Sequence, residues 1–456
     1  MKIQSIELHN VQQFASLKMP LAPTPKHPGH VTVLIGNNGT GKTALLHSLA
    51  TSLSWLVARL RREQGNGRPI PEQAITNGAH SANITLHINT DKIQLTDQAD
   101  TPPDTSYQWR IAKTLFGYTS EQLSDLTGVS KLAEHYRTML TTSDTSSLPL
   151  FVFYTVERVV LDIPLKIKNK HTFSQMDGYD NALGLGVDFR RFFEWFRERE
   201  DIENETGISQ TLLKELQKKI EPSSHIWQAL IQAQATSRDR QLMAVRQAIK
   251  YFMPGFSNLK IRRKPRLHMS IEKQGETLDV AQLSQGEKSL MALVGDIARR
   301  LAMMNPALEN PLQGQGIVLI DEIDMHLHPR WQRSIIDRLT TTFPECQFVL
   351  TTHSPIVISE PKDILVYTLG EGEPREVTTQ YGQDVNSVLL DVMDTDIRNQ
   401  EVAKKLNALF EAIQTADYEQ AHVLMIQLES EIPDNHIELI KARLLLRKQE
   451  LHNAQD

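Results

Sequence analysis

The chain has 456 residues, with 49 lysines and arginines against 55 aspartates and glutamates, and a formal net charge of −6. This balance excludes a generally basic nucleic-acid-binding chain, so any contact with DNA would come from a local patch. The single cysteine, Cys346, excludes a disulfide framework, and no segment approaches the ~18 apolar residues that a membrane-spanning helix needs. We therefore expect a cytoplasmic protein with room for two or three lobes.

The first element with a clear chemical meaning is a glycine-rich loop that follows a short apolar strand at residues 31–35. The loop matches the phosphate-binding pattern G-x-x-x-x-G-K-[ST] with Gly36, Asn37, Asn38, Gly39, Thr40, Gly41, Lys42 and Thr43. Apolar residues at helical spacing follow it, so the loop opens a helix whose dipole and free N–H groups favour phosphate. We predict that Lys42 contacts the β- and γ-phosphates of ATP and that the Thr43 hydroxyl binds Mg²⁺.

An inserted helical lobe is expected between this loop and residue 283. Four phenylalanines recur at the spacing of one helix face, at Phe189, Phe192, Phe193 and Phe196. Sustained heptads are absent, so we expect no long coiled-coil arms. The densest basic run follows at residues 260–266, KIRRKPR, which is either a solvated strand edge or a surface that holds the phosphate backbone of DNA.

Residues 283–288, LSQGEK, predict the start of a helix. Ser284 can cap the first turn, and Glu287 stands three residues later, as in a capping box. An apolar face that includes Met291, Val294 and Ile297 continues the helix. Taken alone, this segment is an ordinary capped helix.

A buried parallel strand is predicted at residues 317–320, and it ends in Asp321 and Glu322. Ligands bind at the carboxyl ends of such strands. We predict that Asp321 holds the Mg²⁺ shell and that Glu322 orients or deprotonates the attacking water.

Histidines follow in two places. His326 and His328 form an H-x-H pair, which is a weak indication of a metal site because a third ligand is missing. A further apolar strand at residues 347–350 leads into Thr351, Thr352 and His353, so His353 is expected at a strand end.

These motifs, in this order, resemble those of the ABC-type ATPases of the SMC/OLD-like branch. The blocks that carry the resemblance are the glycine-rich loop, LSQGEKSL at 283–290, LIDEID and HLHP at 319–329, and TTHSP at 351–355. The resemblance implies an α/β ATPase head, with a mixed sheet flanked by helices, that binds ATP and Mg²⁺ between two copies of the chain. It also implies that Ser284, Gly286 and Glu287 belong to a signature sequence that meets the γ-phosphate held by the other copy. Residues 324–329 would line the interface between the copies, and His353 would sense the γ-phosphate.

Looser features resemble the PtuA-like ATPase subunits of Septu and retron-linked anti-phage systems. They are the pattern FYxxxR at 153–158, YDNAL at 179–183, FEWF at 193–196 and the final helices. This resemblance implies an ATPase that regulates a separate HNH-type nuclease and acts against phage. The alternatives are a DNA maintenance ATPase that clamps duplex ends, a nucleotide-sensing scaffold with little turnover, and the motor of a transporter.

The chain is expected to divide into four segments. These are an N-terminal part of the ATPase head at 1–165, the inserted helical lobe at 166–260, a C-terminal part of the head at 261–395, and a helical tail at 396–456. Three helices are expected from Glu401 on, either for docking or oligomerisation or packed on the head. Such a tail leaves no place for a Toprim nuclease domain after the ATPase.

One residue of the ABC pattern is not assigned. ABC ATPases carry a glutamine between the phosphate loop and the helical lobe, and its amide reaches Mg²⁺ and the attacking water. Gln73 is the earliest candidate, but no strand is predicted before it. Arg158, after a strand at 150–154, is an alternative contact near the nucleotide.

Overall fold

The computed structural model of the chain describes residues 1–90, 105–119, 122–143, 146–156, 173–184, 189–206, 224–225, 228, 238–370, 373–378, 380–393 and 399–453. The chain divides into two compact units, Met1–Gln383 and Asp384–Asp456. Among the described residues, the first unit has three separate β-sheets and the second is helical.

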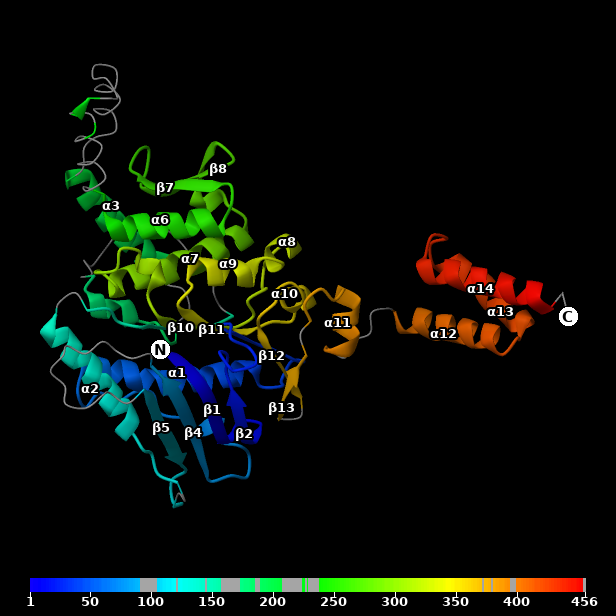
Figure 1. The fold of residues 1–456 in the computed structure, drawn as a ribbon, viewed down its shortest axis with the longest axis horizontal. Coiled ribbons are helices and arrows are strands. Elements are labelled where there is room, and N and C mark those ends of the chain that lie inside the picture. Colours follow the sequence, from blue (N-terminus) through cyan, green and yellow to red (C-terminus); the bar gives the residue numbers. More distant parts are fainter. Residues whose placement is uncertain are drawn as a thin grey trace. The chain divides into compact units, whose positions relative to one another are not determined.

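An antiparallel sheet of four strands comes first, in the order β2-β1-β4-β5 (Figure 1). Its strands are β1 (Lys2–Val11), β2 (Phe14–Pro20), β4 (Ser81–Asn89) and β5 (Ser106–Thr114). Ile84, Leu86 and Ile88 all point to the buried face of β4, because alternate residues of a strand share one side.

The central sheet has six strands in the order β13-β12-β3-β11-β10-β6. They are β3 (Val31–Ile35), β6 (Leu150–Tyr154), β10 (Gly316–Ile320), β11 (Cys346–Thr351), β12 (Leu365–Gly370) and β13 (Glu373–Val377). Every neighbouring pair is parallel except β12 with β13. Strands β3, β6, β10 and β11 are buried along their whole length, as expected for a parallel sheet that is covered on both faces.

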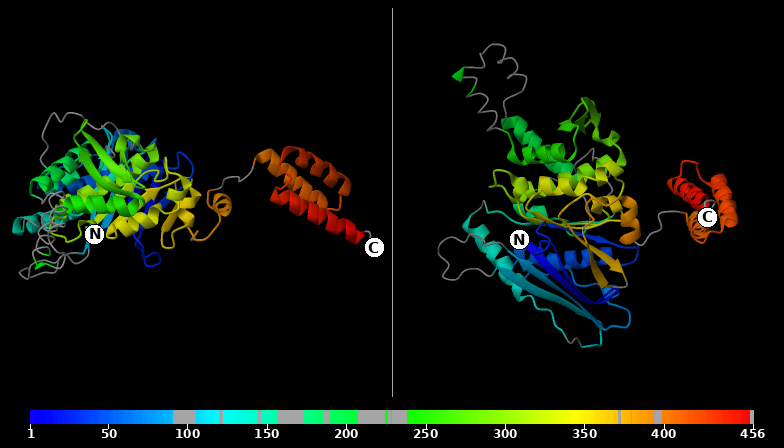
Figure 2. Two further views of the ribbon diagram at one scale, coloured as in Figure 1. Left: turned by 90° about the horizontal axis from the view of Figure 1, so that it is seen from above. Right: turned by 45° about the vertical axis from the view of Figure 1, so that its right-hand side comes forward.

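Helices cover both faces of this central sheet (Figures 1 and 2). α1 (Lys42–Arg61) lies between the central and the antiparallel sheets, and it buries leucines on both sides, including Leu45, Leu49 and Leu56. α7 (Gln285–Met304) lies on the other face, with α3 (Phe189–Thr206), α6 (Arg240–Phe252) and α9 (Ile335–Thr342). The predicted α/β head, with a mixed sheet flanked by helices, is confirmed.

Shorter helices complete the first unit. Within the described residues, these are α8 (Pro329–Gln332), α10 (Pro355–Ser359) and 3₁₀ turns at Glu72–Ala74, Gln175–Tyr179, Val280–Gln282 and Pro311–Gln313. The longer α2 (Thr127–Thr142) also belongs to this unit. Among the helices of the described ranges, there is no candidate for a membrane span.

The phenylalanine stripe that predicted a helical lobe lies on α3. All four rings are buried, and a methyl group added at Gly295 of α7 would lie 2.9 Å from the ring of Phe192. The stripe therefore packs α3 closely against α7.

A third sheet has three antiparallel strands, β7 (Phe256–Arg262), β8 (His268–Lys273) and β9 (Glu276–Asp279). β7 continues across the boundary expected at 260–261, because its pairing with β8 binds both sides of that boundary into one hairpin. The sheet leads through the 3₁₀ turn at Val280–Gln282 into α7.

The second unit contains α11 (Val385–Asp391), α12 (Gln400–Gln414), α13 (Tyr418–Glu431) and α14 (Ile437–Asn453). The three helices expected from Glu401 on are confirmed, and they pack side by side (Figures 1 and 2). Their common core consists of Leu406, Leu409, Ala412, Ile413, Ala421, Met425, Leu428, Leu439, Ala442 and Leu446. The unit begins at Asp384, and the tail boundary expected at 396 stays a prediction.

The buried thiol gives a direct test of the packing of the central sheet. Cys346 is 1% exposed at the start of β11, and burial raises the pKa of its thiol to about 12. Only the thiolate attacks a disulfide reagent, so at pH 8 we expect no reaction of the native protein over minutes. In guanidinium chloride the same reagent should titrate one thiol per chain. Fast reaction of the native protein would contradict this packing.

Candidate nucleotide-binding site

The carboxyl ends of four parallel strands bring the sequence motifs to one edge of the central sheet. β3 ends at Ile35, before the glycine-rich loop; β10 ends at Ile320; β11 ends at Thr351; and β6 ends at Tyr154. β11 lies between β3 and β10, so the loop and the acidic pair are one strand apart. Segments that are distant in the sequence therefore meet at this edge, which is where ligands bind in such sheets.

The glycine-rich loop requires its glycines for two reasons. Gly36, Gly39 and Gly41 have φ angles of 141°, 83° and 96°, which side chains disfavour. A Cβ atom on Gly36 would lie 2.6 Å from the carbonyl oxygen of Leu369, and one on Gly41 would lie 1.8 Å from Nε2 of Gln13. The loop therefore holds its backbone in a cradle that fits a phosphate chain.

Lys42 begins α1 directly after this cradle. Its Nζ donates to the carbonyl oxygens of Gly36, at 2.7 Å, and Asn37, at 2.9 Å, which holds the ammonium against the loop. Burial lowers the pKa of Lys42, and the nearby carboxylates, Asp321 first, act in the opposite direction. The cation is therefore placed between the loop and the acidic pair.

Asp321 is 1% exposed, and both of its carboxylate oxygens accept hydrogen bonds. Thr43 Oγ1 donates to Oδ2 at 2.8 Å, across 278 positions of the chain, and Thr351 Oγ1 donates to Oδ1 at 2.6 Å. Hydroxyl and carboxylate oxygens are the hard ligands that Mg²⁺ prefers, so Thr43 and Asp321 fit the predicted metal role.

Glu322 and His353 are held at the same edge by backbone contacts. The amide of Glu322 donates to Oγ1 of Thr351 at 2.7 Å, and Glu322 has a positive φ of 46°, an uncommon conformation outside glycine. Asp324 accepts from the Thr352 hydroxyl and, at 3.3 Å, from the amide of His353. Both predicted catalytic side chains are at least partly exposed, whereas the groups that hold them are buried or half-buried.

The signature sequence forms the predicted cap of α7. Ser284 Oγ accepts from the amide of Glu287 at 3.4 Å, and Oε2 of Glu287 accepts from the amide of Ser284 at 3.0 Å. Lys273 of β8 donates to Oε1 of Glu287 at 2.8 Å, so both oxygens of that carboxylate are engaged in the cap. A Cβ atom on Gly286 would lie 2.4 Å from the carbonyl oxygen of His326, which brings the signature against residues 324–329.

Of the two candidates for the role of the missing glutamine, Gln73 is among the described residues and Arg158 is not. Gln73 lies in the 3₁₀ turn Glu72–Ala74 and lines a cavity of about 260 Å³ with His47 and Ser48, between α1 and the antiparallel sheet. The chain that leaves the central sheet beside β10 is instead the one after β6, whose Tyr154 pairs with Ile320. Arg158 follows there but lies outside the described residues.

The two histidines after the acidic residues have structural roles, one at a helix cap and one at a turn. His328 Nδ1 accepts from the amide of Arg330 at 3.2 Å and caps α8, and His326 has a φ of 62° at the turn. Within the ranges that the structure describes, no group of three or more His, Cys, Asp or Glu side chains is placed to hold a metal.

The basic run forms the end of β7 and the turn before β8. Two of its cations have acidic partners: Arg263 pairs with Asp201, and Arg266 lies 3.7 Å from Asp279. Arg262 and Lys264 are exposed beside them. Contact between this turn and DNA stays a prediction.

Two threonines are functional candidates whose roles the sequence did not indicate. Thr351 joins Asp321 to Glu322, and Thr352 joins Asp324 to the segment that carries His353. The available signal was a pair of polar residues at the end of an otherwise apolar strand. Its meaning depends on which strand lies next to β11.

Comparisons with known proteins find relatives described as ATPases. Residues 5–221 match a family model described as "AAA domain", and residues 158–359 match one described as "AAA domain, putative AbiEii toxin, Type IV TA system". The "Retron Ec83 probable ATPase" of Escherichia coli is 34% identical over 408 residues, which cover 82% of this chain and 72% of that protein. The chain belongs to the family of this retron ATPase.

Two further likenesses are more limited. The "Septu protein PtuA" of Bacillus mycoides (strain KBAB4) is 45% identical over 94 residues, 21% of this chain and 13% of that protein. The crystal structure of an Smc head bound to the C-winged helix domain of ScpA has a TM-score of 0.44 at 16% identity, and covers 83% of this chain and 98% of that one. Its similarity to the retron and Septu proteins identifies the chain as an ATPase of anti-phage defence.

Thr351→Val tests the support of the acidic pair. Valine keeps the shape but removes the donor to Asp321 and the acceptor for the amide of Glu322. Loss of such a supporting contact typically costs about 10- to 100-fold in metal affinity or activity. We expect a drop of this size in ATP turnover and a shift of the Mg²⁺ titration of activity to higher concentration.

Thr32→Val is the matched control for this variant. Thr32 is equally buried in the neighbouring β3, and its hydroxyl accepts from the amide of Ala22 at 2.9 Å, away from the site. It should lose stability without a change in the Mg²⁺ titration. Equal titrations for the two variants would show that Thr351 has only a packing role.

Proposed function

We propose that the chain hydrolyses ATP at a composite site, for which each of two copies supplies a different part. The observation that carries this proposal is that one chain has two features suited to phosphate on different elements. The loop, Lys42, Asp321 and Glu322 gather at the edge of the central sheet, while α7 presents an exposed Ser284 at its N-terminus. The first amides of a helix lack intrahelical partners and favour anions.

In one copy, the loop amides and Lys42 would bind the phosphate chain. Thr43 and Asp321 would hold Mg²⁺, which supplies charge neutralisation between the β- and γ-phosphates. Glu322 would accept the proton of the attacking water, and His353 would contact the γ-phosphate. Because phosphoryl transfer needs little covalent help from the protein, positioning and charge stabilisation would carry the catalysis.

The second copy would supply the signature. Ser284 and Gly286 would contact the γ-phosphate, with Glu287 fixing the cap rather than touching the nucleotide. The contact of Gly286 with His326 supports this arrangement, because it places the signature and residues 324–329 side by side on one surface. Nucleotide bound between copies would then set the geometry of the pair.

We propose further that this geometry controls a separate HNH-type nuclease. Kinship with the retron ATPase and the Septu protein supports the proposal, and so does the second unit of the chain. Val423 and Ile426 on α13, and Ile437 and Leu444 on α14, are between 55% and 67% exposed. Exposed apolar side chains at this density are typical of a docking or oligomerisation surface.

Complementation between two inactive variants tests the composite site. Lys42→Ala removes the phosphate contact of one part, and Ser284→Arg blocks the other part. Each variant alone should be inactive. Mixed and allowed to exchange subunits, they should recover about a quarter of wild-type turnover, because about half of the dimers are mixed and each has one intact site. No recovery, with mixed dimers verified by two affinity tags, would refute the proposal.

Glu322→Gln tests the catalytic base and the partner together. Loss of a general base typically costs ~10²- to 10⁴-fold, so turnover should fall by at least about 100-fold while ATP is still bound. Because the bound state is prolonged, the tagged variant with ATP should retain a protein with an HNH motif from its native cell better than the wild type does. Glu345→Gln, at the opposite end of β11, is the control and should behave as wild type. Unchanged turnover would remove Glu322 from catalysis.

A further inference from the structure

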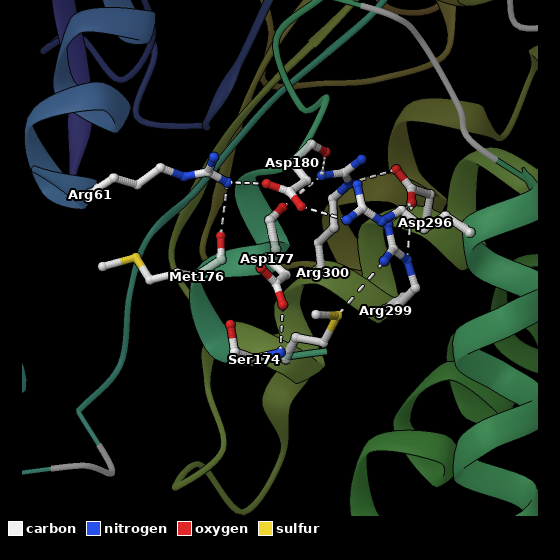
Figure 3. A network of polar contacts seen from close by, with 11 residues as sticks. Arg61, Ser174, Met176, Asp177, Asp180, Asp296, Arg299 and Arg300 are labelled. Carbon is white, nitrogen blue, oxygen red and sulfur yellow. Dashed lines mark hydrogen bonds and ion pairs between the residues drawn. The ribbon is translucent and has the colours of Figure 1, made fainter. Parts of the chain in front are cut away.

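The middle of the signature helix contains a cluster of charged residues without access to solvent (Figure 3). Asp296, Arg299 and Arg300 of α7 are all 0% exposed. Arg299 Nη2 donates to Oδ1 of Asp296 at 2.6 Å, and Arg300 Nε donates to Oδ2 at 2.7 Å. Burial raises the pKa of Asp296, but the guanidiniums of Arg300 and Arg299 outweigh it and hold the pKa below its usual value. The carboxylate is therefore ionised at neutral pH.

Such a cluster is not an efficient way to stabilise a fold. Removing charges from water is expensive, and apolar residues of similar volume often pack as well or better. Charged groups with fixed hydrogen-bond directions do, however, determine orientation more narrowly than apolar contacts do. The question is therefore which elements this cluster orients.

One connection leads to the acidic edge of the nucleotide site. The hydroxyl of Tyr154, at the end of β6, donates to Oδ2 of Asp296 at 3.0 Å. Burial, together with the Asp296 carboxylate, raises the pKa of Tyr154 well above its usual value, so the hydroxyl keeps the proton it donates. The carbonyl oxygen of the same Tyr154 accepts from the amide of Asp321 at 2.8 Å. A single residue thus joins α7 to the metal-binding aspartate.

The other connection leads to the helix of the glycine-rich loop. Arg300 Nη1 donates to the carbonyl oxygens of Gly178, at 2.6 Å, and Asp180, at 3.0 Å. The Asp180 carboxylate in turn accepts from Arg61, in the last turn of α1 (Figure 3). Residues 179–183 are the YDNAL motif, which the nucleotide site by itself leaves without a role.

We propose that Asp296 is a positioning residue, which acts with Tyr154, Arg300 and Asp180 to fix the signature helix relative to the rest of its own head. The inference rests on the composite site proposed above, because only there does the direction of α7 affect a reaction in another copy. Ser284 lies twelve positions before Asp296, about 18 Å along the helix axis. A rotation of about 5° at the cluster would move that end by about 1.5 Å, and a misplacement of about 1 Å can cost ~10²-fold in rate.

Tyr154→Phe removes the hydrogen bond from the tyrosine hydroxyl to Asp296 and leaves the aromatic ring in place. Thr32→Val is its control, because Thr32 is also buried and its hydroxyl also makes one hydrogen bond, with the amide of Ala22 at 2.9 Å, outside this cluster. Both variants should lower Tm by a similar amount and bind ATP as wild type does. Only Tyr154→Phe should lower turnover at saturating ATP, by about 10-fold.

The complementation pair shows in which copy Tyr154 acts. Placed in the Lys42→Ala chain, which supplies the signature to the intact site, Tyr154→Phe should lower the recovered turnover by about 10-fold. Placed in the Ser284→Arg chain, which supplies the glycine-rich loop, it should leave the recovered turnover within about 2-fold. An equal effect in both chains, or none in either, would overturn the inference. Absence of any recovery before Tyr154 is changed would instead overturn the composite site.

Asp180→Asn provides a second test of the inference in case Tyr154→Phe does not fold. It removes the charge that Arg61 contacts at the outer end of the chain of bonds, where the side chain is partly exposed. It should show the same dependence on which copy carries it. If the recovered turnover is the same whichever copy carries Asp180→Asn, and the variant has the Tm of wild type, the positioning role would also be contradicted.

Discussion

The site depends on the buried carboxylate of Asp321. A charge with 1% exposure is costly unless hydrogen bonds compensate it, and here the hydroxyls of Thr43 and Thr351 bind one oxygen each. One hydroxyl comes from the helix after β3 and the other from the end of β11. Both contacts require β3, β11 and β10 to lie in this order, so the order of strands in the central sheet also assembles this part of the site.

The N-terminus and the middle of the signature helix meet opposite physical demands. Its N-terminus is exposed, and the side chains of Ser284 and Glu287 cap each other's backbone amides there. Its middle is buried among charges that bind it to β6 and to residues 178–180. A contact surface for another copy must be exposed before assembly yet fixed in direction, and anchoring the helix away from its functional end satisfies both needs.

Much of the chemistry was predictable because it is local. A strand, a glycine-rich loop and a helix follow one another directly, so the sequence alone predicted Lys42 and Thr43; the acidic pair and the capping box are likewise contained within a few residues. The amphipathic patterns of α3 and of the last three helices also follow from spacing alone, and the structure confirms them.

What the sequence could not determine is which strands are neighbours. Pairing of β11 with both β3 and β10 gives Thr351 its place between Asp321 and Glu322, and pairing of β6 with β10 brings Tyr154 to Asp296. The same holds for the place of Gln73, which lines a cavity with residues of α1, among them Ala44 and His47. The sequence by itself predicted the glycine-rich loop and the helix that follows it, because their geometry is set by adjacent backbone. Only the tertiary structure decided which residues support them, because those contacts join segments that hydrogen bonds between distant strands bring together.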